Sequence, residues 1–394
     1  MKKLIVFILS LYFLVTPVEF ILNHLLGGSA KYLGGVSIGL IIIYLLSSRK
    51  KFSVRFHHIL IILWVFYGLL TLMWADFNEF TVQYFSTYLS MVTFFVFSTS
   101  IRYTESEYNK ILTFALIGTL IISLLLVFQQ ESYYSGSIVA RKTVNLFGVK
   151  QDPNNIAATI LVGVAISLDR ILRHKTRMKS RLLILIILIT AIILTGSRGG
   201  FLSLLILIFI FLLMAHKSYD VQRIKISSRA GLLMIAVISL GVVLVFIPDT
   251  LVNRIFDISS YASGSGRTEL WNLAWNGIKN NILFGNGIAS QANYYLSYFG
   301  YAKGIHNTFL MVLFETGILG LSLFLASFLI ILRKNLRKKN VMEASLLVAT
   351  MITSFFLDVL IARFLWNAVI LSAISIDVQR NIVGEKPDEN SYNI

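Results

Sequence analysis

Three basic side chains of this sequence stand where helices are expected to begin: Arg198, Arg267 and His306. The backbone N–H groups at a helix start already carry partial positive charge, so a cation there is unfavourable unless an anion lies between them. Arginine can hold a phosphate through two parallel hydrogen bonds, and Gly199 and Gly200 would let phosphate oxygens approach the backbone. The three positions together predict a binding site for a phosphate-like anion.

Each of these residues also has a simpler interpretation. Arg198 could extend to the headgroup level of a membrane, and Arg267 could be a solvated loop charge. His306 could cap its helix or lie in the interface. Chance seldom places all three at helix starts on one side of a protein, so the set favours a functional site.

Acidic and amide residues supply further candidates for substrate binding. Glu315 lies roughly 13 Å into the apolar run that follows the histidine, where a carboxyl marks a function or a buried partner. For Glu315 a structural hydrogen bond to a neighbouring helix is slightly favoured over direct chemistry. Asp152 and Asn154 flank a proline at an expected helix start, where capping is the ordinary role, although Asp152 could contact a sugar hydroxyl or act as a base. Glu269 and Asn307 complete this set.

The elements that must position these residues are transmembrane helices. The chain has 394 residues, of which 56% are hydrophobic and only 14% charged, which is more apolar surface than a soluble core can bury. A bilayer core needs roughly 20 apolar residues per helix, and the sequence predicts an all-α polytopic membrane bundle of about 12 transmembrane helices. The predicted spans are residues 4–25 (an uncleaved first span), 31–48, 57–75, 81–101, 109–129, 154–170, 181–196, 198–215, 230–247, 305–332, 341–357 and 358–376.

The distribution of basic residues predicts the orientation. With a cytoplasmic N-terminus, the inner segments carry 25 of the 35 Lys and Arg residues, as the positive-inside rule requires. Residues 1–376 then form a single integral membrane domain, residues 248–304 a long extracytoplasmic loop within it, and residues 377–394 a polar cytoplasmic tail. Asp358 and Arg363, near the outer half of the last span, are expected to pair with each other or with other helices rather than to act in catalysis.

The long outer loop contains one expected helix. Apolar and small residues recur at helical spacing after a Gly-Ser-Gly breaker, and Trp271 and Trp275 add an aromatic edge. This pattern predicts a short amphipathic helix near the membrane surface. The residues of its apolar face are Leu270, Leu273, Ala274, Gly277 and Ile278.

Several common chemistries have no sequence signal here. There is no cysteine, hence no disulfide, thiolate metal site or cysteine nucleophile. No phosphate-binding Gly-rich loop, dinucleotide fingerprint or convincing metal-ligand spacing occurs. No metal or other cofactor is therefore expected, and an ATP-driven pump is disfavoured. The net charge of +16 lies in short clusters between apolar segments, which indicates topology signals rather than nucleic-acid binding.

Three groups of short motifs follow one another along the chain. They are Ser197-Arg198-Gly199-Gly200, then Arg267-Thr268-Glu269-Leu270-Trp271 with Phe284-Gly285-Asn286-Gly287, then His306-Asn307 leading to Glu315-Thr316-Gly317 and Gly320. Together they resemble the O-antigen ligase and O-antigen polymerase family of bacterial cell-envelope transferases. Their order and membrane context make the resemblance more specific than any single motif, and it extends over about half the chain. One departure is Asn281, where many relatives have a proline.

The resemblance implies metal-independent, inverting glycosyl transfer on the outer face from a polyprenyl-pyrophosphate-linked glycan. By motif, Arg198 and Arg267 would hold the donor pyrophosphate, and His306 would orient or activate the acceptor hydroxyl. A leaving pyrophosphate needs fixed positive charge where negative charge develops, so the physical argument agrees. His306, Asp152 and Glu269 are candidates for the general base.

Within that class, a polymerase is favoured over a ligase because it is the commoner role in the family, not because of any motif. The product would be capsule, O-antigen or exopolysaccharide at the bacterial cytoplasmic membrane. The expected partners are the lipid-linked donor, the glycan acceptor, membrane lipid and other polysaccharide-assembly proteins. The alternatives are a lipid-linked oligosaccharide flippase and a non-catalytic partner of an assembly complex. A transporter should place its polar residues near the bilayer midplane, whereas here they gather at one face.

Overall fold

The computed structural model describes most of the chain. Its described parts are residues 1–48, 52–75, 79–129, 132–133, 141–173, 176–218, 267–301 and 303–378. The predicted span at 230–247 and most of the predicted tail lie outside these parts, as does the first third of the predicted outer loop.

The described residues form helices connected by short segments and two small hairpins. The helices are α1 (Lys2–Val15), the 3-10 turn η1 (Thr16–Val18), α2 (Glu19–Leu26), α3 (Ser29–Ser47), α4 (Phe56–Thr71), α5 (Glu79–Thr99), α6 (Glu105–Phe128), α7 (Pro153–Arg173), α8 (Met178–Leu194), α9 (Arg198–Ser218), α13 (Arg267–Asn280), α14 (Gln291–Phe299), α15 (Thr308–Arg337), α16 (Val341–Ser354) and α17 (Arg363–Ser375). The hairpins are antiparallel pairs of two-residue strands, β1 (Ser132–Tyr133) with β2 (Arg141–Lys142) and β3 (Asn145–Leu146) with β4 (Val149–Lys150).

The chain is an all-α polytopic membrane protein. Every predicted span within the described residues contains a helix, and seven helices there are long and apolar enough to cross a membrane. The first predicted span is bent, since η1 with Pro17 separates α1 from α2. A total of twelve spans stays a prediction.

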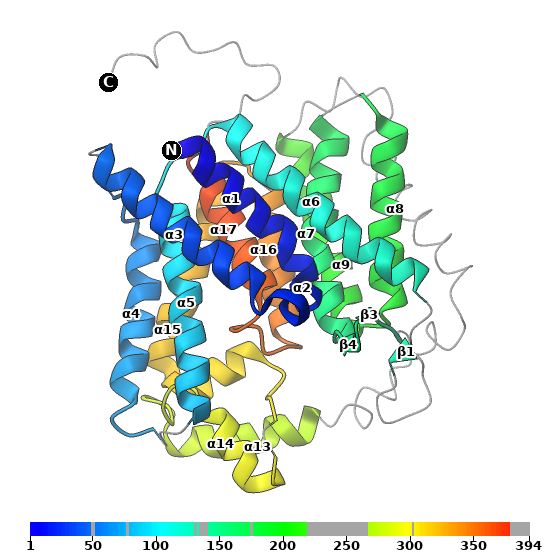
Figure 1. Cartoon of the computed structure of the whole chain (residues 1–394). Coiled ribbons are helices and arrows are strands. Elements are labelled where there is room, and N and C mark those ends of the chain that lie inside the picture. The colour runs from blue at the N-terminus through cyan, green and yellow to red at the C-terminus, as the bar shows by residue number, and fades with distance from the viewer. Residues whose placement is uncertain are drawn as a thin grey trace.

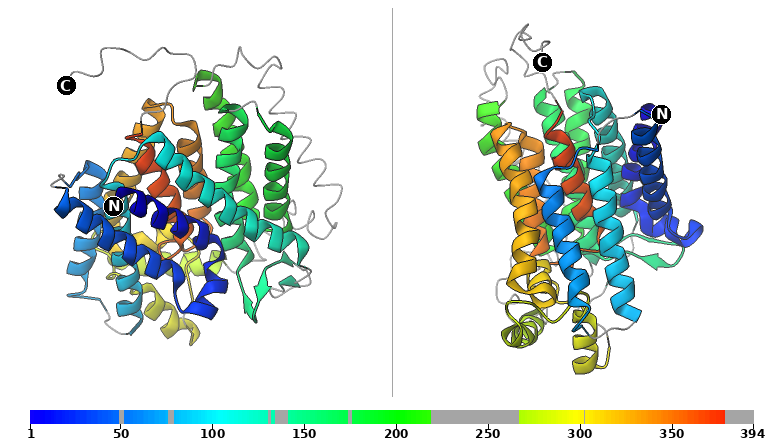
Figure 2. Two further views of the ribbon diagram at one scale, coloured as in Figure 1. Left: turned by 45° about the horizontal axis from the view of Figure 1, so that its top comes forward. Right: turned by 90° about the vertical axis from the view of Figure 1, so that its left-hand side faces the viewer.

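The long helices lie side by side, and the short helices α13 and α14 gather at one end of the bundle (Figures 1 and 2). The N-terminus lies at the opposite end. We refer to these as the α13 end and the N-terminal end. The helix starts at Pro153, Arg198 and Thr308 belong to the α13 end, because α7, α9 and α15 run from it toward the N-terminal end.

α16 and α17 form the centre of the bundle. Every residue from Phe364 to Ser375 is buried, and α16 packs against α7, α9, α15 and α17. Helices that are apolar on all sides are expected in such interior positions. A buried carboxyl there has a hydrogen-bond partner, because the Tyr108 hydroxyl donates to Glu343 Oε1 at 2.9 Å.

The amphipathic helix predicted in the outer loop is confirmed as α13. The buried residues of α13 are the five that the apolar pattern selected: Leu270, Leu273, Ala274, Gly277 and Ile278. Protein rather than lipid covers this face, because Gly277 lies against the ring of Phe314 on α15. The Tyr295 hydroxyl of α14 also donates to the Leu270 carbonyl.

α15 is interrupted at Gly317, whose φ of 63° and ψ of −169° are not helical. The interruption leaves backbone groups on both sides without helical partners, and the loop 282–287 pairs with them. We call this arrangement the α15 joint. Its hydrogen bonds run from Asn286 N to Phe314 O (2.9 Å), Gly287 N to Glu315 O (2.9 Å), Ile318 N to Ile282 O (2.9 Å) and Leu319 N to Leu283 O (3.4 Å).

Candidate functional site

The start of α9 is fixed by local hydrogen bonds. The Ser197 hydroxyl accepts the Gly200 N–H at 3.1 Å, which is the ordinary geometry of a helix N-cap. The Thr195 hydroxyl in turn accepts the Ser197 N–H at 3.2 Å. Arg198 is therefore the first helical residue, as predicted, and its side chain is half-buried.

Gly199 and Gly200 are required by packing. A Cβ on Gly199 would lie 2.9 Å from the Cβ of Phe356, and one on Gly200 would lie 2.5 Å from the Cβ of Ala157 on α7. These distances are shorter than real Cβ contacts, so the two glycines let α9 approach its neighbours. Close approach of a phosphate to this backbone stays a prediction.

His306 lies beside a carboxylate. The backbone N–H of His306 donates to Asp358 Oδ2 at 2.9 Å, and the N–H of Asn307 donates to Asp358 Oδ1 at 3.1 Å. The imidazole Nδ1 is 3.8 Å from Oδ2 of the same carboxyl, and 43% of the His306 side chain is exposed. The cap of α15 is Asn307, whose Oδ1 accepts the Leu310 N–H at 3.0 Å, so His306 is not needed for capping.

Asp358 belongs to the segment that connects α16 and α17, outside both helices. It does not pair with Arg363, which instead forms an ion pair with Glu19 of α2. Burial raises the pKa of the Asp358 carboxyl, and His306 and its N–H, the Asn307 N–H and Arg267 all oppose that shift. The segment thus holds a carboxyl whose charge depends on the site around it.

Arg267 reaches the same segment from α13. Its guanidinium carbon is 5.9 Å from the ring centroid of Phe356, within the range of a cation–π contact. It is also close enough to Asp358 to interact with that carboxyl. Because Phe356 touches Gly199 as well, the starts of α9, α13 and α15 all adjoin the segment Phe356–Asp358.

Asp152 and Asn154 have local structural contacts. Asp152 Oδ1 accepts the Asn154 N–H at 2.6 Å at the start of α7, which is the capping role that the sequence favoured. Asn154 Oδ1 accepts a hydrogen bond from Arg141 at 2.8 Å, and Arg141 also donates to the Thr195 carbonyl at 2.9 Å. This buried arginine, which sequence reasoning missed, connects β2 to the starts of α7 and α9.

The two glutamates differ in exposure. Glu269 is exposed in the first turn of α13, whereas Glu315 is fully buried. The Ala289 N–H lies near the Glu315 carboxyl, but neither carboxyl oxygen has a hydrogen bond of normal geometry among the described residues. The side-chain hydrogen bond to a neighbouring helix, which was the favoured expectation, is therefore wrong within the described parts. The Glu315 carbonyl does take part in the α15 joint.

The residue that sequence reasoning undervalued most is Asp358. The available signal was an acidic residue in an apolar stretch, which is unusual in a membrane protein. Its partner was hidden because His306 is 52 residues earlier in the chain.

The fold and these contacts define a polytopic membrane protein with two arginines, a histidine and a carboxylate near one segment at the α13 end. Residues 183–325 match the model of the O-antigen ligase family, and this match confirms the resemblance of that part of the chain to the family. The matched region includes Arg198, Arg267 and His306 and ends before Asp358. No curated protein matches the chain. The family indicates a membrane enzyme of polysaccharide assembly and gives no support to a flippase.

Proposed function

We propose that this protein is a glycosyltransferase that polymerises polyprenyl-pyrophosphate-linked oligosaccharides at the outer face of the bacterial cytoplasmic membrane. The observation that supports the proposal best is the meeting of three helix starts at the segment Phe356–Asp358, with Arg267 beside Phe356 and His306 beside Asp358. Ligation to a lipid acceptor is the second form of the same chemistry, since the family match includes ligases.

In the proposed reaction, Arg198 and Arg267 bind the donor pyrophosphate. The acceptor hydroxyl oxygen attacks the anomeric carbon from the side opposite the pyrophosphate, and the bond from that carbon to the pyrophosphate oxygen breaks with inversion. The electron pair stays on the leaving oxygen, where the two guanidinium groups stabilise it. The charge is supplied by side chains, so the step requires neither nucleotide nor divalent metal.

The proton of the acceptor hydroxyl passes to His306 in this proposal. A carboxylate beside an imidazole orients the ring and stabilises the cation that forms, and Asp358 lies 3.8 Å from Nδ1. Asp152 is a weaker candidate for the base because its carboxyl caps α7. Glu269 is exposed in the first turn of α13, so it is accessible to an acceptor.

The test is transfer by the purified full-length protein given a polyprenyl-pyrophosphate oligosaccharide, with chelator and without nucleotide. We expect a ladder of glycan lengths on the lipid and release of free polyprenyl pyrophosphate. One addition to a separate lipid acceptor, with no ladder, would indicate a ligase. Movement of intact lipid-linked glycan across a bilayer, without glycan transfer, would show that the protein is a transporter and not an enzyme.

The proposed orientation places the α13 end outside and both chain termini in the cytoplasm. The chain has no cysteine, so single-cysteine variants report the position of each end. Ser297 on α14 and Ser48 after α3 are both exposed and lie at opposite ends of the bundle. In intact cells an impermeant thiol reagent should label Ser297→Cys and leave Ser48→Cys unlabelled. The reverse pattern would place the candidate site in the cytoplasm and contradict the proposed reaction.

A further inference from the structure

A polar cavity of about 470 Å³ lies between α6, α7 and α8 at the N-terminal end, far from the candidate site. Its volume is within the range of small-molecule binding sites. We call it the arginine cavity because four arginines line it, together with two carboxylates. The arginines are Arg170, Arg173, Arg177 and Arg181, and the acids are Glu105 and Asp169.

The carboxylates among the described lining residues balance only part of the positive charge of the arginine cavity. Arg173 donates to both carboxyl oxygens of Asp169 at 2.9 Å, so this pair is neutral. Arg170 and Arg181 lie close enough to repel each other, and Arg181 donates to the backbone carbonyl of Arg170. Among the described lining residues, four guanidinium groups face two carboxylates, and a bound anion would offset the difference in charge.

A buried hydroxyl in the same cavity is a second, independent indication of a ligand. Ser167 on α7 lines the cavity and is only 2% exposed. Its Oγ has no hydrogen-bond partner among the described residues. A buried hydroxyl without a hydrogen-bond partner destabilises the protein, so a ligand oxygen that accepted its hydrogen bond would be bound more favourably.

The walls of the arginine cavity are apolar beside these polar groups. Leu112 and Leu116 of α6, Ile166 of α7 and Ile184 of α8 line it. A ligand that fits both surfaces carries a phosphate and a hydrocarbon chain. Basic pockets between transmembrane helices are suited to the headgroups of anionic lipids.

We propose that the arginine cavity binds the phosphate headgroup of an anionic phospholipid such as phosphatidylglycerol. The phosphate lies between the guanidinium groups and accepts a hydrogen bond from Ser167, and an acyl chain follows the apolar walls between α6 and α8. The free energy of binding comes from charge-assisted hydrogen bonds and from burial of the chain. The proposal does not depend on the reaction at the α13 end.

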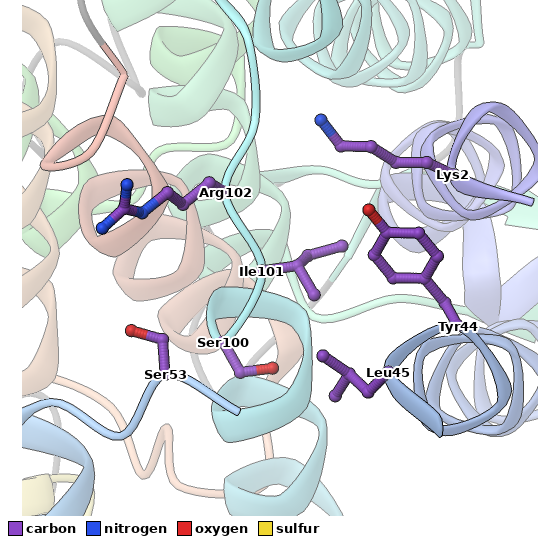
Figure 3. Close-up of a pocket in the computed structure, with 7 residues that line it drawn as sticks. All are labelled: Lys2, Tyr44, Leu45, Ser53, Ser100, Ile101 and Arg102. Carbon is purple, nitrogen blue, oxygen red and sulfur yellow. The ribbon is translucent and has the colours of Figure 1, made fainter. Parts of the chain in front are cut away.

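A second cavity at the N-terminal end provides a matched comparison (Figure 3). Its volume is also about 470 Å³, but among its described lining residues only Lys2 and Arg102 are basic. Lys2 is paired with Glu107 at 2.6 Å, and the Arg102 guanidinium extends away from Lys2. The Ser100 hydroxyl there already donates to the Phe97 carbonyl. Phosphatidylglycerol should therefore prefer the arginine cavity.

The experiment measures binding of short-chain phosphatidylglycerol to the delipidated full-length protein by native mass spectrometry. The variant Arg177→Gln/Arg181→Gln removes two charges from the arginine cavity, and Lys2→Gln/Arg102→Gln removes two from the comparison cavity. Each basic residue near a membrane surface contributes roughly a factor of five in affinity. We expect the first variant to bind about 30-fold more weakly and the second to bind like the wild type. Phosphatidylcholine of the same chain length should bind weakly to all three proteins.

Ile184→Trp fills the arginine cavity without changing its charge and should also reduce binding. Its elution volume and circular dichroism establish that it is folded. If inorganic phosphate bound to the arginine cavity as tightly as phosphatidylglycerol does, the cavity would be a site for free anions, and the lipid assignment would be overturned. Wild-type affinity in both Arg177→Gln/Arg181→Gln and Ile184→Trp would overturn the proposal altogether.

Discussion

The α15 joint and the segment Phe356–Asp358 lie at the same end of the bundle, and motif residues meet in both. At the α15 joint the motif residues act through the backbone, because Gly285 and Gly317 allow two chain segments to exchange hydrogen bonds. Around Phe356–Asp358 they meet through charged side chains, for which we propose a chemical role. Under this proposal short motifs serve folding in one region and chemistry in the other, and substitutions should separate the two roles.

The largest effect is expected at the α15 joint from Gly317→Ala. The backbone of Gly317 is in a region that other residues rarely adopt, and a Cβ there would lie only 2.5 Å from the Leu283 carbonyl carbon. Strain and overpacking together should cost about 2–6 kcal/mol. The expected result is loss of monodisperse protein, or a much lower melting temperature in detergent.

The control for this variant is Gly35→Ala. Gly35 lies within α3, and a Cβ there would have no neighbour within 4 Å. Alanine is the better helix former, so stability should stay the same or rise slightly. Equal stability of Gly317→Ala and the wild type would show that the joint does not require glycine.

At the charged region, Arg198→Lys and Arg267→Lys should abolish most glycan transfer while leaving the melting temperature nearly unchanged. An ammonium keeps the charge but cannot reproduce the planar two-point contact of a guanidinium with phosphate. Loss of one such preorganised contact costs on the order of 10²–10³ in rate. Arg102→Lys, at the N-terminal end, is the matched control. Normal transfer by both site variants would refute their assigned roles.

A smaller effect is expected from Asp358→Asn. The substitution keeps the shape but replaces one of the two carboxyl oxygens that accept the backbone N–H groups of His306 and Asn307 with an NH2 group, and it removes the charge beside the imidazole. A hydrogen bond from a backbone N–H to a charged carboxylate contributes about 1.5–3 kcal/mol, and its loss would loosen the position of His306, so kcat should fall roughly ten- to a hundredfold. KM for the donor should change little, because the donor is assigned to the arginines. A large rise in KM with unchanged kcat would place Asp358 in donor binding instead.

The smallest effect is expected from Trp271→Phe. The Trp271 indole N–H donates to the Ile305 carbonyl at 3.0 Å and connects α13 to the segment just before His306. Its loss should cost about 1 kcal/mol, and should reduce transfer a few-fold by loosening the position of His306. The exposed Trp275 on the same helix is the control, and Trp275→Phe should have no effect. An equal effect of both variants would show that the Trp271 hydrogen bond does not help to position His306.

Local patterns in the sequence predicted much of the fold. Apolar runs predicted the long helices, and the spacing within residues 267–280 predicted which face of α13 would be buried. The starts of α9 and α13 at Arg198 and Arg267 were likewise predictable, because cap residues and glycine breakers act over a few neighbouring positions. All of these properties depend on residues within one or two helical turns of each other.

The pairings between distant segments were decided only by the tertiary structure. Asp358 accepts hydrogen bonds from the backbone of His306 and Asn307 instead of pairing with Arg363, and Phe356 lies against both Gly199 and Arg267. The glycines of the α15 joint likewise acquire their role only when the loop 282–287 meets Gly317. Composition and hydropathy determine by themselves that this chain forms apolar helices, because helical hydrogen bonds are local. Which side chains meet depends on how those helices pack, since contacts between helices join residues that no local spacing relates.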